Sequence, residues 1–246
     1  MEIFSVNDPP AFPADLVIAR ILMYDGELSA EEIGIIAAWA KENYGTPLPS
    51  PELPTLTVTP LYDWDMADAD VDSHALVADV VDKVSGEHLS QAVVSQRPRL
   101  LQGQFLGRPG ASFRNNDHAE LIAGTIADTD APHSAVMVYR DWDTPSGAQF
   151  FSDGWHMGGD PQTITAGKGS DGRINSIFGP SSVKAQAEGD EALAHIHMLS
   201  VPSPAAAGTA QIDDQTPVVG PGTGDQRLNP PMTIGTRDPT NIGFAN

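Results

Sequence analysis

The chain contains no cysteine, few basic residues and no long apolar run. Without thiols it can form neither a disulfide nor a thiolate metal or redox site, so the cysteine count leaves the cellular compartment open. Only 13 lysines and arginines stand against 33 aspartates and glutamates, which gives a formal charge of −20. Such a surface repels phosphate backbones, so we expect no nucleic-acid partner. The charge serves either solubility or the binding of cations.

No apolar stretch approaches the roughly 18 residues that a membrane-spanning helix needs, so we expect no membrane insertion. The first ten residues lack the basic and apolar regions of a secretory signal, and we therefore expect no signal peptide. If the protein acts outside the cell, we expect another route of release, such as lysis.

The 23 glycines and 21 prolines favour short strands joined by turns over a helical bundle. Turn signals recur about every ten residues in the second half of the chain, which is typical of a sandwich or barrel. We therefore expect an all-β fold. The predicted strands span residues 111–113, 120–127, 133–140, 149–152, 173–177, 194–201 and 232–235.

One helix is predicted, over residues 30–44. Ser29 and Glu32 form a capping box, apolar residues then repeat at helical spacing, and Pro47 prevents continuation. Just before it, residues 16–24 (LVIARILMY) are apolar enough for a strand buried on both faces. Residues 1–45 are therefore predicted to form a strand–turn–helix unit.

The rest of the chain divides into two parts. Residues 46–60 carry five prolines and are predicted to be an extended connector. Residues 61–246 are predicted to form the main β-sandwich. Within it, residues 202–231 are rich in Pro, Gly, Ala and Thr, and we expect a long excursion with little secondary structure.

Short motifs in the chain resemble the two ends of a concanavalin A-like lectin/glucanase (laminin-G-like) domain. Residues 61–68 (LYDWDMAD), 80–89 (VVDKVSGEHL) and 106–113 (LGRPGASF) resemble its opening strands. Residues 18–32 (IARILMYDGELSAEE) and 39–45 (WAKENYG) resemble its last strand and closing helix, and residues 232–235 (MTIG) resemble the strand before them. The resemblance implies a jelly-roll β-sandwich that is circularly permuted, with its final elements at the N-terminus.

The permuted arrangement requires residues 18–23 to lie next to residues 232–235. Either the strand at 16–24 closes the sheet of its own chain, or it is donated to a neighbouring copy. A sheet that lacks this strand would expose an unpaired edge and invite association.

The resemblance implies binding rather than catalysis. Catalytic members carry E-x-D-x-x-E on one strand, which places two carboxylates close enough for retaining hydrolysis. The sequence has no such run, and residues 188–191 (EGDE) have the wrong spacing. His195 and His197 alternate, so they face one side of a strand, either as half-buried histidines or as ligands of a shared metal. We therefore expect no enzyme and no catalytic residue.

Two sets of residues are candidates for ligand binding. An aromatic ring beside carboxylates suits sugar recognition, because the ring covers the C–H face while polar groups bind hydroxyls. This set contains Asp141, Trp142, Asp143, Trp155 and His156, although Trp155 also fits a core position.

The second set offers carboxylate oxygens of the kind that Ca²⁺ binds. It contains Asp63, Asp65 and Asp68. The alternative is a solvated acidic surface, in which case no cofactor is needed.

The leading hypothesis is a non-catalytic binding or adhesion module that recognises a cell-surface glycan. By analogy, we expect it in a phage-like particle, as a fibre, spike or decoration on the virion surface, in a homo-oligomer or larger assembly. The alternative is a purely structural virion or assembly protein. A glycoside hydrolase is a third hypothesis, which the missing carboxylate triplet disfavours.

Overall fold

The computed structural model describes residues 16–24, 26–45, 55–113, 119–125, 133–141, 149–152, 156–157, 160–161, 164–168, 173–178, 181–187, 194–201, 207–213, 215–222 and 231–235. Side chains are described for residues 17–24, 26–44, 55–113, 119–123, 134–140, 194–200, 208–213, 215–220 and 234–235. Most of the predicted connector, residues 46–54, lies outside these ranges.

The described residues form two large antiparallel sheets. Sheet A runs in the order β18 (Val218–Gly222), β17 (Ala207–Ile212), β16 (His195–Val201), β9 (His133–Asp141), β1 (Leu16–Tyr24), β7 (Arg108–Phe113) and β6 (Arg99–Phe105), and β2 (Pro60–Asp65) also pairs with β1. Sheet B runs in the order β15 (Ser181–Ala187), β14 (Arg173–Phe178), β13 (Ile164–Lys168), β10 (Gln149–Ser152), β19 (Pro231–Ile234), β8 (Leu121–Thr125), β5 (His88–Ser90), β4 (Val77–Val81) and β3 (Asp70–Val71). A separate pair joins β11 (His156–Met157) to β12 (Asp160–Pro161).

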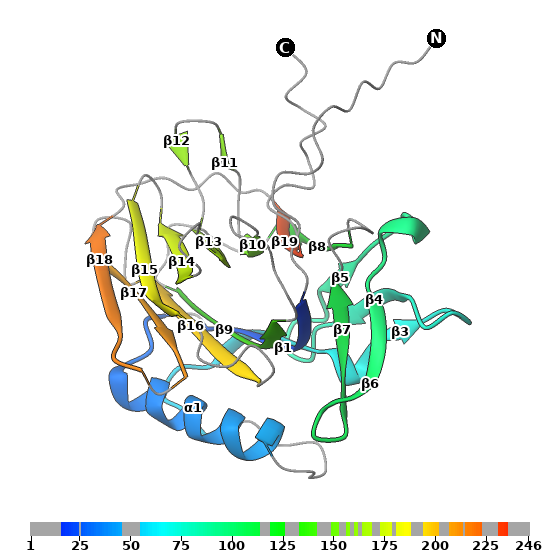
Figure 1. Cartoon of the computed structure of the whole chain (residues 1–246), viewed down its shortest axis with the longest axis horizontal. Helices are drawn as coiled ribbons and strands as arrows, with labels where there is room; N and C mark the ends of the chain where they lie inside the picture. The colour runs from blue at the N-terminus through cyan, green and yellow to red at the C-terminus, as the bar shows by residue number, and fades with distance from the viewer. Residues whose placement is uncertain are drawn as a thin grey trace.

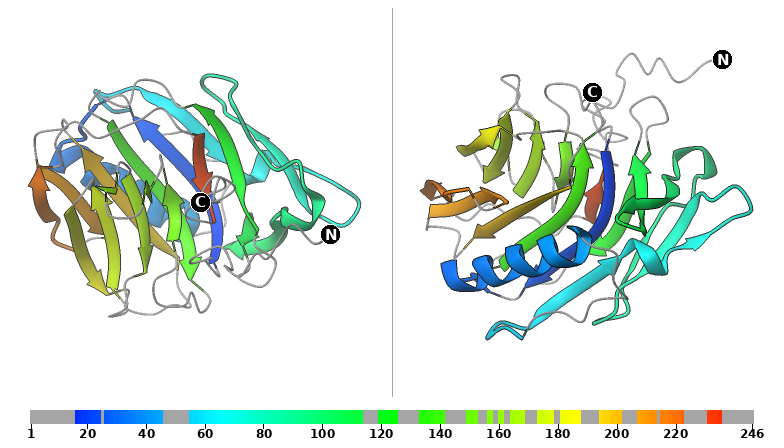
Figure 2. Two further views of the ribbon diagram at one scale, coloured as in Figure 1. Left: turned by 90° about the horizontal axis from the view of Figure 1, so that it is seen from above. Right: turned by 60° about the horizontal axis from the view of Figure 1, so that its bottom comes forward.

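The elements stack in three layers, which confirms the predicted all-β sandwich. Helix α1 (Ala30–Gly45) lies along the face of sheet A that points away from sheet B (Figure 1, Figure 2). One hydrophobic cluster fills the space between the sheets and includes Trp64, Phe113 and Tyr139. A second cluster fills the space between sheet A and the helix and includes Ile36 and Phe105. Sheet A is therefore covered on both faces.

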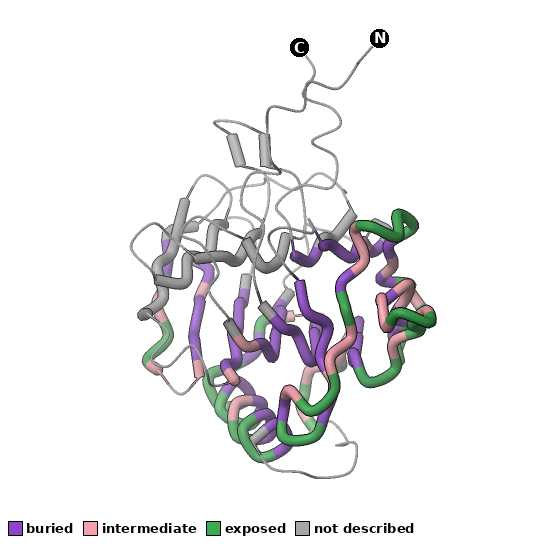
Figure 3. Tube along the Cα trace, turned by 45° about the vertical axis from the view of Figure 1, so that its right-hand side comes forward, coloured by how far each residue is buried: buried purple, intermediate pink, exposed green. Residues whose placement is uncertain are grey.

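Strand β1 lies in the middle of sheet A and confirms the predicted strand at 16–24. It pairs with β9 along its length, and on its other side with β7 and then with β2. Because both edges and both faces are covered, residues 17–24 are all buried, with exposed fractions of 0–3% (Figure 3). This burial explains why the strand is apolar at nearly every position.

Residues 18–23 do not pair with residues 232–235 in one sheet, as the permuted arrangement required, although both contribute to the core between the sheets. Strand β19 lies in sheet B between β10 and β8, whereas β1 lies in sheet A. Only residues 25–29 separate β1 from α1, so β1 belongs to the sheet that the helix covers. Motif order along a chain does not fix which strands are neighbours, because a connection can cross from one sheet to the other.

The two ends of the folded region nevertheless meet across the core. Leu16, at the start of β1, is the register partner of Phe113 in β7. Gly235 follows β19 and packs on the same phenylalanine: a Cβ added to Gly235 would lie 2.3 Å from Cδ1 of Phe113. Phe113 therefore stands between the first described strand and the last.

The helix begins as predicted and ends within a residue of the predicted end. The backbone N–H of Ser29 donates to Oε2 of Glu32 (2.9 Å), and the N–H of Glu32 donates to Oγ of Ser29 (3.2 Å), which completes the capping box. Glu32 also accepts a hydrogen bond from the N–H of Thr57 (3.1 Å). The hydrogen bonds from Thr57 and Ser29 lower the pKa of Glu32 to about 2. The same carboxylate thus caps the helix and anchors the chain that returns from it.

The prediction of little secondary structure in residues 202–231 is also wrong. Strands β17 and β18 both lie in this stretch and extend sheet A beyond β16. Ala210 and Ile212 alternate into the core between the sheets. The small residues around them make this alternation weak in the sequence, and the prolines and glycines hide it further.

Gly235→Ala tests the contact between β19 and Phe113. The backbone at Gly235 has φ +90°, and an added Cβ would also lie 2.5 Å from the carbonyl oxygen of Ala119. Overpacking and backbone strain together should lower the free energy of unfolding by about 3 kcal/mol. Gly86→Ala is the matched control, because Gly86 has φ +78° and open space around it. Gly86→Ala should lower the free energy of unfolding, measured by urea denaturation, by about 1 kcal/mol. An equal decrease for both variants would contradict the close contact at Gly235.

Candidate functional site

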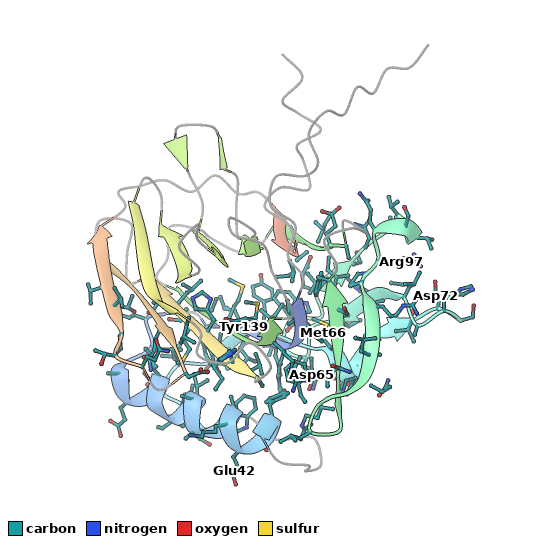
Figure 4. All side chains as sticks on the ribbon, viewed as in Figure 1. Glu42, Asp65, Met66, Asp72, Arg97 and Tyr139 are labelled. Atoms are coloured by element: carbon teal, nitrogen blue, oxygen red, sulfur yellow. The ribbon has the colours of Figure 1, made fainter. Side chains whose placement is uncertain are left out.

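The aspartates predicted to bind calcium surround a buried arginine. A β-bulge in β1 lies between Ile18 and Arg20, and Arg20 stands opposite Asp65 of β2. Nε and Nη2 of Arg20 donate to the two carboxylate oxygens of Asp63, at 2.7 and 2.6 Å. Nη1 lies 3.6 Å from Oδ2 of Asp65. All three side chains are almost fully buried, and Asp65 lies in the interior beside β1 (Figure 4).

A second cation completes this cluster. Nζ of Lys83 lies 3.0 Å from Asp65 and 2.9 Å from Asp68. Burial alone would lower the pKa of the Arg20 guanidinium, but the hydrogen bond and charge of Asp63, with Asp65 and Tyr44 nearby, raise it above its ordinary value. The structure therefore brings Asp63, Asp65 and Asp68 together, but around two side-chain cations.

This geometry gives the calcium prediction no support. Within the described residues, no group of three or more His, Asp or Glu side chains is arranged to hold a metal ion. Most of the predicted sugar-binding set lies outside the described residues. Trp142, Asp143 and Trp155 lie outside the described residues, Asp141 ends β9 and His156 begins β11, and the side chains of these two are not described.

A cavity of about 850 Å³ lies between α1 and the outer face of sheet A, and we call it the helix–sheet pocket. The helix contributes six lining residues: Gly34, Ala37, Ala38, Ala40, Lys41 and Tyr44. The sheet and its turns contribute Leu106, Val138, Arg140, Ala194, His195, Ile196, Gln211 and Asp213. Gly34, Ala38, Lys41 and Leu106 are exposed and form the rim.

Small residues on the helix create this pocket. Ile33, Ile36 and Trp39 fill the space between α1 and sheet A, and they fix the height of the helix above the sheet. Ala37 packs against this cluster, whereas Gly34 and Ala38, on the exposed rim, have no side chain long enough to fill the space beside it. The pocket is thus the part of the interface that the sequence leaves unfilled.

Arg140 is the main charged group of the pocket floor. Val136 and Val138 of β9 belong to the helix-side core, and strand alternation places Arg140 on the same face. Its guanidinium carbon lies 5.8 Å from the centre of the Phe105 ring. Nε of Arg140 is buried and has no hydrogen-bond partner among the described residues.

The only acidic lining residue in the described part of the chain, Asp213, is already occupied. Its Oδ1 accepts from the backbone N–H of Ile196 (2.8 Å), and its Oδ2 lies 2.9 Å from Nδ1 of His195. The carboxylate therefore holds the turn after β17 onto β16. Lys41 and Arg140 form no ion pair with any residue that the structure describes. The pocket carries a local positive charge on an acidic protein.

His195 and His197 share one face of β16, as their alternation predicted. Ile196 and Met198, on the opposite face, pack in the helix-side core. The ring of His195 lies 5.9 Å from Tyr139, which belongs to the core between the sheets. Burial lowers the pKa of His197 to about 4, although Asp213 opposes this shift. His197 is therefore neutral at physiological pH.

The helix–sheet pocket was not predicted from the sequence. One signal was available: Gly34, Ala38 and Lys41 follow one another at helical spacing, which predicts a stripe of small residues ending in a cation. Arg140 and Gln211 carried no comparable signal, because their position at the pocket follows from the pairing of distant strands.

Arg20→Met tests the buried ion pairs. The substitution leaves Asp63 and Asp65 buried without their cation, which should lower the free energy of unfolding by about 3–5 kcal/mol. Lys83→Met is the control, because the Lys83 side chain is one-third exposed. This substitution should lower the free energy of unfolding by less than about 1 kcal/mol. Urea denaturation at pH 7 measures both, and similar losses would contradict the central role of Arg20.

The low pKa of His197 predicts that the folded protein loses stability in acid. The unfolded chain binds a proton at this residue near pH 6.5, and the folded chain only near pH 4. The free energy of unfolding should therefore fall as the pH drops from about 6.5 to about 4, by on the order of 3 kcal/mol from this group. His197→Gln should flatten this dependence, and His74→Gln, at an exposed site, should leave it unchanged. An equally steep dependence in His197→Gln would refute the assignment.

Comparisons with known proteins supply no family for this chain: no protein-family model, no curated protein and no solved structure matches it. No helix among the described residues is long and apolar enough to span a membrane.

Proposed function

We propose that the protein is a non-catalytic binding module and that a glycan occupies the helix–sheet pocket. One observation carries the proposal: α1 and sheet A enclose a cavity of about 850 Å³ whose walls combine apolar and polar groups. Pockets for small ligands span roughly 300–1,000 Å³ and use a few polar groups on a mostly apolar surface to orient the ligand.

The lining suits a ligand with apolar C–H faces and many hydroxyls. Val138, Ile196 and the small helix residues offer apolar surface, while Lys41, Arg140 and Gln211 offer hydrogen-bond donors. Burial raises the pKa of the Tyr44 hydroxyl to about 12, so this hydroxyl stays protonated and uncharged at physiological pH. Hydrogen-bond donors beside apolar surface match the hydroxyls and the C–H face of a sugar ring.

The proposal rests on the pocket and not on the resemblance to concanavalin A-like domains. The strand neighbours that the permuted arrangement required differ from those observed, since β1 and β19 lie in different sheets. The absence of an E-x-D-x-x-E run from the sequence favours binding over glycoside hydrolysis.

We also propose that the module acts at the surface of a phage-like particle that is released by lysis. The support is compositional: a chain without cysteine folds equally well in a reducing cytoplasm and outside the cell. Its strongly acidic composition favours solubility in either setting.

A structural subunit is the second candidate, and exposed valines favour it. Val71 of β3, Val81 of β4 and Val84, Val93 and Val94 are 37–53% exposed. They belong to the segment that forms the β3 edge of sheet B. Exposed apolar residues near a free sheet edge are suited to contact with another subunit.

Ala38→Leu tests the pocket as the binding site. Ala38 is exposed on the pocket rim, and leucine keeps the helix propensity while its side chain enters the cavity. On an array of bacterial and host glycans, wild-type protein should bind, and Ala38→Leu should lose at least about tenfold in affinity. Ala30→Leu is the matched control, since Ala30 is exposed on α1 away from the pocket.

Two outcomes would overturn the proposal. Absence of glycan binding by wild-type protein would favour the structural subunit. Undiminished binding by Ala38→Leu would exclude the helix–sheet pocket as the site. Thermal unfolding of each variant checks that the fold is retained.

A further inference from the structure

We infer that the ligand of the helix–sheet pocket is a glycan with an acidic sugar, whose carboxylate is bound by Arg140 from the sheet and Lys41 from the helix. This inference rests on the proposed function and names the class of glycan. Three observations carry it: the position of Arg140, the absence of a described counter-ion, and the place of the pocket along α1.

Arg140 is positioned to bind a planar anion. Its guanidinium lies beside the Phe105 ring, which restricts the side chain on the floor of the pocket. Its buried Nε lacks a hydrogen-bond partner within the described structure. A buried donor of this kind favours a ligand that supplies the missing acceptor. The guanidinium fork matches the two oxygens of a carboxylate better than it matches single hydroxyls.

Lys41 adds a second positive charge from the opposite wall. It is exposed on the rim, where its flexible side chain is accessible to a ligand that enters the pocket. Asp213 is the one acidic lining residue in the described part of the chain, so its single negative charge offsets only one of these two positive charges. The described lining therefore carries a net positive charge that an acidic ligand would balance.

The charge of the whole chain selects against polyanions. At −20, the protein repels a highly charged polymer over a Debye length of about 8–10 Å. The two pocket cations act only at short range, within a cavity that admits a few sugar rings. A glycan with a single carboxylate at its end satisfies both conditions, and a sulfated polymer does not.

The place of the pocket favours a carboxylate over a phosphate. Phosphate sites commonly use backbone N–H groups at a helix N-terminus. Here the lining residues of α1 begin at Gly34, one turn beyond the N-terminal residue Ala30, and the donors are side chains. Carboxylate recognition by a guanidinium needs no such backbone donors.

Titration calorimetry with paired glycans tests the inference. The probes are oligosaccharides ending in glucuronic, galacturonic or N-acetylneuraminic acid, each beside its carboxyl-reduced counterpart. We expect wild-type protein to bind at least one acid about tenfold or more tightly than its reduced form. Equal binding of acid and reduced form would overturn this inference and leave the glycan-binding proposal standing. Absence of binding to these probes and to the neutral glycans of the array would overturn both.

Arg140→Gln and Lys41→Gln test whether each of the two cations binds the carboxylate. Each should weaken binding of the acid by about tenfold while leaving the affinity for the reduced form unchanged. Arg99→Gln is the control, because it removes the same charge from an exposed position on β6 outside the pocket. An equal loss for acid and reduced form in Arg140→Gln would show a structural role and refute the assignment. Tighter binding of heparin than of the single-acid glycans would refute it in favour of a polyanion.

Discussion

The buried guanidinium of Arg20 is the constraint on which the arrangement of sheet A depends. It pairs with Asp63 and lies near Asp65, which fixes the register of β2 against β1. A slip of one residue would turn these aspartates toward the apolar core and bring Trp64 to the outer face. The same guanidinium lies 5.3 Å from the centre of the Trp39 ring. One side chain thus links the central strand, its neighbour and the helix.

The helix–sheet pocket follows from this linkage. Trp39, Ile33 and Ile36 hold α1 at the distance that large side chains require. The small residues on the adjacent side of the helix cannot fill the same distance, and a cavity remains. The close packing around Arg20 and the cavity beside Arg140 therefore both follow from the position of the helix. A cavity formed in this way is bounded mainly by a helix and by strands, and such elements hold their positions better than loops.

Local patterns predicted the elements that are buried or capped by their own sequence neighbours. The strand at 16–24, the helix at 30–44 and its capping box follow from periodicity and from short-range hydrogen bonds. The place of β19 and the role of Asp63 could not be predicted in the same way. The cation that binds Asp63 lies 43 residues away in the sequence, so an acidic cluster looked solvated or metal-binding. The pocket likewise exists only once β9, β16 and α1 have assembled.

Phe113 separates the first described strand from the last, with Leu16 paired beside it and Gly235 packed on its ring. The polypeptide therefore enters and leaves the domain at the same place, on two sides of one side chain. The chain is therefore suited to circular permutation. A short linker would join those two points, and the new ends would lie in the turn at Leu106 and Gly107, between β6 and β7, so that no strand is lost. Segments that continue from Leu16 and from Gly235 would start as close neighbours, so the described fold is suited to insertion into a loop of a larger protein.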